Sequence, residues 1–182
     1  MERHEILDTI SDRSLVKRVQ TGDREAYEVL INRYYRLIYG ICFGIVSNPH
    51  DSQDLCQDVL MQGYVNICSL RSGDRFGYWL AGIARNRCLD WLRRQSRMRL
   101  STSHLAERID TDTNDDLKSE VTEAVAQLPM ELRVPLTMYY LDGQNCRAIS
   151  KILGISHASV WRRLKSAKQQ MYQLLKGADH EI

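Results

Sequence analysis

Several common kinds of functional site are missing from this 182-residue sequence. It contains no HExxH, Walker or GxGxxG pattern, and its five histidines are dispersed, so we expect no catalytic residue, no metal site and no cofactor. The five cysteines are odd in number and scattered, without CxxC or Cys/His zinc spacing. Reduced thiols are therefore expected rather than a disulfide framework.

Long hydrophobic runs and strand patterns are also missing. The longest apolar run, Leu37 to Val46, is about half the length that crosses a bilayer. No signal peptide precedes the first helical pattern, so we expect a soluble, cytoplasmic protein with no direct membrane insertion. No segment alternates apolar and polar residues as a strand does, and the predicted fold class is all-α.

Helical periodicity occurs in two blocks separated by a polar stretch. Apolar residues recur at helical spacing from Ala26 to Ile45, again over 50–70, and in a third helix from Phe76. The periodicity disappears into Ser, Thr and Asp near residue 98 and returns at 117. We therefore predict two small helical domains, 12–97 and 117–176, joined by a flexible acidic linker over 98–116.

The net charge of +2 hides a strong segregation of charge along the chain. Residues 85–99 include six arginines against one acid, and residues 107–123 include seven acids against two basic residues. Residues 161–176 carry five basic residues and no acid. Two basic blocks flanking an acidic one predict two polyanion-binding modules.

The segment 148–168, AISKILGISHASVWRRLKSAK, has the pattern of a helix-turn-helix. Gly154 permits a tight turn, and Ser156 stands where a helix N-cap is expected. The second helix has an apolar stripe at three- and four-residue spacing: Val160, Leu164, Ala167, Met171 and Leu174. Its basic residues fall mostly outside this stripe, which favours entry into a DNA major groove. An amphipathic hairpin with a solvated basic face stays open as the alternative.

Four sequence motifs occur one after another along the chain. Segment 51–59, DSQDLCQDV, is similar to the pattern D-A-x-D-L-x-Q-E-V. Segment 76–86, FGYWLAGIARN, is similar to F-x-x-W-L-x-x-I-A-x-N, and DWLRR at 90–94 continues it as D-x-x-R-R. Leu128, Pro129, Gly143 and the helix-turn-helix complete the series. Over residues 12 to 176 the chain thus resembles the extracytoplasmic-function sigma factors, minimal two-domain promoter-recognition subunits of bacterial RNA polymerase.

The resemblance implies an alternative sigma factor that binds core RNA polymerase and directs promoter-specific transcription initiation. It implies region 2 at 12–97 and region 4 at 117–176. The implied polymerase contacts are Asp54, Leu55, Gln57 and Asp58. The implied minus-ten DNA contacts are Arg71, Ser72, Arg75, Arg85, Asn86, Arg87, Arg93 and Arg94. The implied minus-thirty-five DNA contacts are Ser156, His157, Ala158, Ser159, Arg162, Arg163 and Lys165. The family's usual further partner is an anti-sigma factor, often membrane-bound.

The residue types agree with these roles. Acidic side chains on one helix suit a basic coiled coil, and cationic side chains hold single-stranded DNA by phosphate attraction. Asn86 is our first choice for a base contact, because its amide both donates and accepts. Trp79 and Trp91 could stack on bases, but both lie near the apolar stripe, which favours a core role.

Departures from the family pattern leave the upstream base sequence open. The residues concerned are Ala148, Ser150 and Ser166 in the helix-turn-helix. Ser52, Gln53 and Asp58 depart from the pattern of the acidic motif instead, and they leave the details of the polymerase contact open. Two other functions stay open as well. A stand-alone helix-turn-helix regulator would bind operator DNA tightly without polymerase, and a thiol redox sensor would need an exposed thiol of low pKa, for which Cys88 is the candidate.

Overall fold

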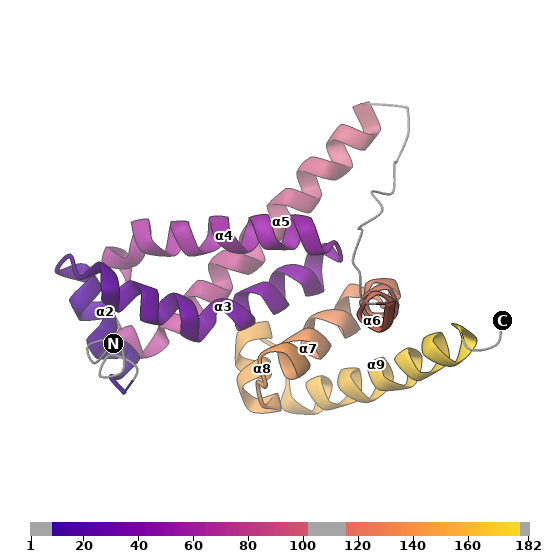
Figure 1. Cartoon of the computed structure of the whole chain (residues 1–182). Coiled ribbons are helices and arrows are strands. Elements are labelled where there is room, and N and C mark those ends of the chain that lie inside the picture. Colours follow the sequence, from indigo (N-terminus) through magenta and orange to yellow (C-terminus); the bar gives the residue numbers. More distant parts are fainter. Residues whose placement is uncertain (1–8, 102–115, 179–182) are drawn as a thin grey trace.

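The computed structural model describes residues 9–101 and 116–178, and every element in these ranges is a helix (Figure 1). The first range holds α2 (Asp12–Gln20), α3 (Arg24–Val46), α4 (Pro49–Asn66) and α5 (Phe76–Ser101). The short 3-10 turns η1 (Ile67–Ser69) and η2 (Gly73–Arg75) connect α4 to α5. The second range holds α6 (Asp116–Gln127), α7 (Met130–Leu141), α8 (Cys146–Leu153) and α9 (His157–Ala178). The predicted all-α fold class is confirmed.

Polar caps fix where several helices begin. Asp23, Asn48 and Asn145 each accept a hydrogen bond from a backbone N–H in the first turn of the helix that follows. Helix α5 ends at Ser101, so residues 98–101 of the predicted linker are helical. The rest of that linker, 102–115, lies outside the described residues.

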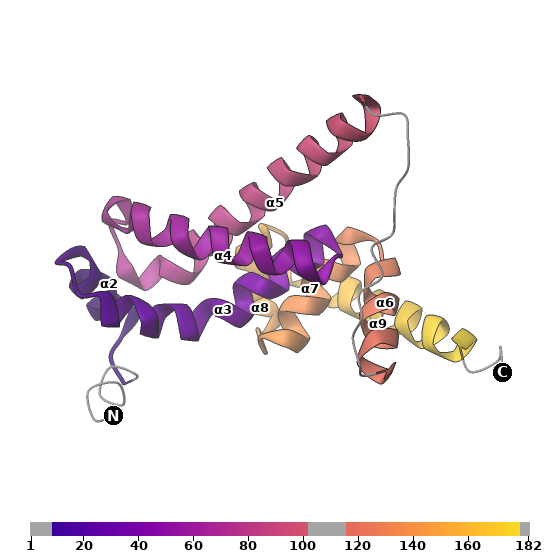
Figure 2. The ribbon, with the colours of Figure 1, turned by 45° about the horizontal axis from the view of Figure 1, so that its top comes forward.

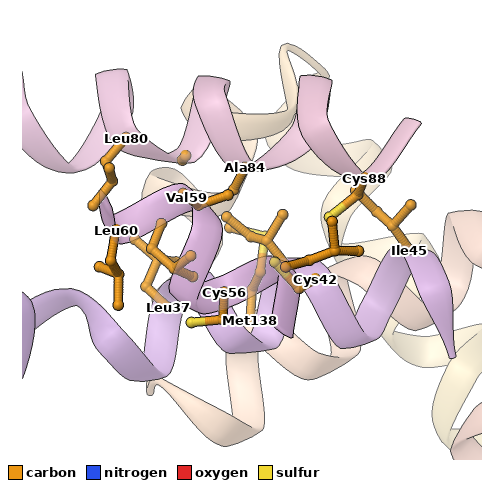
Figure 3. Close-up of a cluster of buried hydrophobic side chains, with 14 of the residues drawn as sticks. Leu37, Cys42, Ile45, Cys56, Val59, Leu60, Leu80, Ala84, Cys88 and Met138 are labelled. Carbon is orange, nitrogen blue, oxygen red and sulfur yellow. The ribbon is translucent and has the colours of Figure 1, made fainter. Parts of the chain in front are cut away.

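Helix α3 is the central element of the N-terminal half. Helices α2, α4 and α5 all pack against it, and their apolar side chains form one core. Figure 3 shows a part of this core that includes side chains of α3, α4 and α5. By length and composition α3 is also long and apolar enough to cross a membrane, but 61% of its most apolar window is buried inside the protein. Its apolar character therefore belongs to the core of the helical bundle.

The C-terminal half docks directly on the N-terminal half through α7 and α3. Met138 of α7 is fully buried among side chains of α3, α4 and α5 (Figure 3). Thr137 donates a hydrogen bond from Oγ1 to the Gly40 carbonyl at 2.7 Å. A Cβ at Gly44 would lie 2.8 Å from the Val134 Cα, so only glycine permits this approach of the two helices.

Arg133 ties the two halves together from inside the interface. It is 7% exposed, and its guanidinium donates to the carbonyls of Gly44 (2.8 Å) and Ile45 (3.3 Å) at the end of α3. It also donates to the carbonyls of Ala126 (2.7 Å) and Leu128 (2.8 Å) at the end of α6. Burial lowers the pKa of Arg133 from its ordinary value. One cation thus satisfies carbonyls that two helix C-termini leave without partners.

Candidate functional site: three exposed faces

Helix α4 presents one exposed stripe that is acidic at its start and apolar at its end. Asp54, Gln57 and Asp58 are exposed, as the sequence predicts. Met61 and Val65 continue the same stripe at helical spacing and are 69% and 77% exposed. We call these five residues the α4 face. Met61 and Val65 were missed by the sequence analysis, although their spacing from Asp54 and Asp58 places them on the same side of the helix.

Leu55 corrects one expected polymerase contact. It is 6% exposed and packs in the core, on the side of α4 that also buries Val59. Its position in the helical repeat lies about 100° from Asp54, which turns it away from the acidic side chains. Leu55 therefore supports the helix from inside, and the apolar surface of the α4 face comes from Met61 and Val65.

Two residues expected to serve different partners contact each other. Arg87 of α5 and Asp58 of α4 form an ion pair at 2.9 Å. The Arg87 Nε is buried without a hydrogen-bond partner, so only part of its guanidinium is satisfied by this pair. The pair links α4 to α5 at the boundary between the acidic surface and the basic one.

Helix α5 turns its basic side chains away from the core. Leu80, Ala84 and Cys88 are buried, whereas four of the predicted DNA contacts are exposed: Arg85, Asn86, Arg93 and Arg94. The C-terminal half of α5 stands out from the bundle in both views (Figures 1 and 2). Trp79 and Trp91 are partly buried against the core, as expected from the apolar stripe.

The loop before α5 is held against α2. A Cβ at Gly73 would lie 2.6 Å from the Arg13 Cα, so the loop passes α2 at a distance that only glycine permits. Gln20 of α2 also donates to the carbonyls of residues 67 and 70. The exposed loop residues Arg71, Ser72 and Arg75 are thereby fixed beside α5. Together with the four exposed residues of α5, they form the α5 face.

The predicted helix-turn-helix is confirmed in its local geometry. Gly154 ends α8 in the left-handed region, with φ of 66°. Ser156 caps α9, because its Oγ accepts a hydrogen bond from the Ser159 N–H at 3.1 Å. The stripe predicted to face inward is buried at its first three positions: Val160, Leu164 and Ala167.

The outer side of α9 carries exposed residues that we call the α9 face: His157, Ala158, Trp161, Arg162 and Lys165. Arg162 donates to the Ser159 Oγ at 3.2 Å, and Lys165 Nζ lies 5.5 Å from the centre of the Trp161 ring. Arg163 differs from the others, because it turns toward α7 and lies 3.8 Å from a Glu131 carboxylate oxygen. Trp161 is absent from the predicted contacts because those residues follow the basic pattern of this helix, and its place on the outer side follows from the helical repeat.

The cysteines offer no exposed reactive pair. Cys88, the candidate redox thiol, is fully buried, so the condition of exposure is not met. A hydrogen bond with Cys88, together with burial, raises the pKa of Cys42. Within residues 9–101 and 116–178, no three His, Cys, Asp or Glu side chains gather closely enough to hold a metal ion.

Comparison with known families gives a consistent result over both halves. The family described as Sigma-70 region 2 matches residues 30–98, and the family described as Sigma-70, region 4 matches residues 118–171. The first match contains α4 and much of α5, and the second contains the helix-turn-helix.

Individual relatives cover nearly the whole chain. The ECF RNA polymerase sigma-E factor of Haemophilus influenzae is 29% identical over 89% of this chain and 94% of that protein. The ECF RNA polymerase sigma factor SigW of Bacillus subtilis is 23% identical over 88% of this chain and 95% of that protein.

Solved structures share the fold at low sequence identity. CnrH in complex with the cytosolic domain of CnrY has a TM-score of 0.66 and 21% identity, over 91% of this chain and 97% of CnrH. RpoE in complex with the anti-sigma factor NepR, from Bartonella quintana, also has a TM-score of 0.66, with 19% identity over 82% of this chain and 96% of that one. The region 2 and region 4 matches stand in the order that the motifs predict, and the relatives align over most of the chain. The chain therefore belongs to the extracytoplasmic-function family of alternative sigma factors.

Proposed function

We propose that the three exposed faces divide the work of this sigma factor between one protein partner and two DNA elements. The single observation that carries this proposal is that the faces differ in charge and polarity. The face on α4 is acidic and apolar, whereas the faces on α5 and α9 are basic. Residues 12–97 act as region 2 and residues 117–176 as region 4. The polymerase carries out RNA synthesis in the cytoplasm, and this chain supplies binding without a catalytic step.

The α4 face docks on core RNA polymerase. Asp54 and Asp58 attract a basic partner surface, and Met61 and Val65 supply the apolar contact area that stabilises a desolvated interface. The Asp58 carboxylate is already paired with Arg87, so docking on a cationic partner competes with this internal ion pair. Asp54 is exposed, and its ion pair among residues 9–101 and 116–178 is the longer contact with His50, at 3.5 Å, so it is the freer of the two acids.

The α5 face binds the minus-ten element and the α9 face the minus-thirty-five element. Arg85, Asn86, Arg93 and Arg94 hold the backbone and base edges of the downstream element, with the loop at 71–75 beside them. Arg162 and Lys165 serve the upstream element, and the capped start of α9 favours a nearby phosphate.

Binding both elements together requires the α3–α7 interface to open. The two promoter elements lie about 25 base pairs apart, or roughly 85 Å at 3.4 Å per base pair. In the docked form α8 packs against α5, and Ile152 of α8 and Tyr78 of α5 line one small cavity of about 150 Å³. The docked form is therefore a resting form of the free protein. An anti-sigma factor that binds this form more tightly than the open one would hold the protein inactive. The similar RpoE is bound to an anti-sigma factor, NepR, in its solved structure.

The polymerase role is tested by charge reversal on α4. Asp54→Lys is expected to weaken association with core RNA polymerase about tenfold, because it replaces attraction with repulsion at a charged interface. Glu28→Lys, at an exposed acid of α3, is the matched control and leaves association unchanged. Titration of labelled protein with core polymerase measures both. Equal affinities for the two variants would contradict the docking role of the α4 face.

A further inference from the structure

Trp161 is a large apolar residue that the fold leaves in solvent. Its side chain is 56% exposed, while its neighbour Val160 and the next-turn residue Leu164 are buried. Helix α9 is therefore well packed at this point, and the exposure of Trp161 follows from its position on the outer side. A single exposed aromatic residue is ordinary on a protein surface, so its surroundings decide what it does.

Those surroundings are cationic and belong to the α9 face. Trp161 lies between Ala158, one turn before it, and Lys165, one turn after it, and Arg162 follows it directly. No acid occurs between residues 142 and 179. The site thus combines an apolar ring with positive charge, which suits a polyanion that also exposes apolar groups.

Lys165 also holds the indole in place. Its Nζ lies 5.5 Å from the ring centre, within the range of a cation–π contact. This contact limits the rotation of an otherwise free side chain, which lowers the entropy lost when the ring binds a partner. Ala158 has a small side chain, so it allows the ring edge and the start of α9 to approach a groove closely.

The major groove offers one apolar group to such a ring. Thymine carries a C5-methyl group there, and contact with this methyl distinguishes thymine from the other three bases. Arg162, by contrast, is a donor that suits the two acceptors of guanine. Two adjacent residues of the recognition helix therefore have different base preferences.

We propose that Trp161 is a specificity-determining residue that contacts a thymine methyl group in the upstream promoter element, with Lys165 orienting the ring. This inference rests on the proposed binding of the upstream element by α9. It adds the chemistry of one base position to that proposal, and it predicts that the upstream element of this protein contains a thymine at a position other than the one that Arg162 reads.

The first test selects promoters with the holoenzyme. Core polymerase reconstituted with the full chain transcribes a library in which the upstream element is randomised, using the wild-type protein, Trp161→Ala, Trp161→Phe and Arg162→Ala. The wild type is expected to select thymine at one position, which Trp161→Ala alone relaxes. Trp161→Phe keeps the preference because an aromatic face remains, and Arg162→Ala relaxes a different position.

The second test removes the methyl group itself. Each thymine of the selected element is replaced in turn by deoxyuridine, which lacks only the C5-methyl. One replacement is expected to reduce wild-type promoter use about fourfold, because the complex loses the burial of one methyl group. The same replacement has no further effect on Trp161→Ala, because the contact is already absent.

The outcomes separate this inference from the function on which it rests. If Trp161→Ala selects the same element as the wild type, or if no deoxyuridine replacement affects the wild type, the thymine contact is wrong. If Trp161→Ala relaxes every upstream position together, its role is structural and the inference is also overturned. If Arg162→Ala and Trp161→Ala both leave the selection unchanged while core binding persists, the assignment of α9 to the upstream element fails.

Discussion

Arg133 and Arg162 lie in the same half of the molecule and are used in opposite ways. Arg133 is buried between α3, α6 and α7 and donates to four backbone carbonyls. Arg162 is exposed on α9 and donates to one side chain, the Ser159 hydroxyl. A buried cation whose donors are engaged stabilises the docked form, whereas an exposed cation with spare donors is available to DNA.

This contrast extends to the surfaces around each arginine. The α3–α7 interface is formed by small residues and apolar side chains at close approach, with Met138 buried among them. The α9 face is formed by residues whose side chains are exposed to solvent. Substitutions in the first region should therefore change stability, and those in the second should change promoter use.

The largest expected effect on stability comes from Arg133→Ala. Truncation leaves the carbonyls at the ends of α3 and α6 buried without donors, which costs about 3–5 kcal/mol in the free energy of unfolding. Arg162→Ala is the control, with a change within about 0.5 kcal/mol because its side chain is exposed. Urea unfolding followed by circular dichroism measures both. A loss below 1 kcal/mol for Arg133→Ala would contradict its role in the interface.

Two glycine-to-alanine substitutions are expected to change the free energy of unfolding by smaller amounts and in opposite directions. A Cβ at Gly44 meets Thr137 Oγ1 at 2.7 Å, whereas a Cβ at Gly82 meets no atom within 4 Å. Gly44→Ala is expected to cost about 1–3 kcal/mol through overpacking, and Gly82→Ala to add about 0.5–1 kcal/mol through helix propensity.

Hydrogen exchange locates this effect. In Gly44→Ala the amides of α7 should exchange faster, because the α3–α7 interface opens more often. In Gly82→Ala their exchange should match that of the wild type. Equal exchange rates in α7 for the two variants would mean that the interface tolerates the added methyl group and that the docking depends on other contacts.

The smallest effect concerns the thiols. Cys42, Cys56 and Cys88 are buried in the core, whereas Cys68 is exposed. Burial raises the pKa of Cys56 to about 12, so this thiol stays protonated at pH 9. A thiol reagent at pH 8 should modify Cys68 first and the three core cysteines only after unfolding. Equally fast reaction of all of them in the native protein would contradict the packing of α4 and α5 on α3.

Stability should also fall at high pH for the same reason. The pKa of the folded Cys56 thiol lies above its ordinary value of 9.0, so from about pH 9 the unfolded chain loses a proton that the folded protein keeps. The contribution of Cys56 is fully present below pH 9 and is lost as the pH rises toward 12. Unfolding midpoints measured from pH 8 to 11 test this fall of stability with pH. In the control Cys56→Ala, the midpoint is expected to fall less steeply over the same range.

The sequence predicted those features that depend on local spacing. The stripe of Val160, Leu164 and Ala167, the cap at Ser156 and the turn at Gly154 all follow from neighbours within one or two helical turns. The docking of α7 on α3 could not be predicted in this way, because it joins Arg133 to carbonyls about ninety residues away.

Leu55 and Trp161 show that membership in a sequence motif and position in the helical repeat can predict different places for a side chain. Leu55 was assigned to the polymerase contact because it belongs to the acidic motif, although the helical repeat places it with the core. Trp161 is not part of the charge pattern that predicts the DNA contacts of α9, although the helical repeat places it on the outer side of that helix. In both cases the helical repeat gives the position of the side chain more reliably than membership in a motif.

The most direct test of the account compares promoter binding with and without core RNA polymerase. Footprinting on a promoter selected by the holoenzyme should show protection of both elements when the protein and core polymerase are present together. The isolated protein should bind that DNA weakly, with little sequence preference and a steep dependence on salt. If the isolated protein instead protects the same two elements with equal affinity, the chain acts as a stand-alone DNA-binding regulator and the account is contradicted.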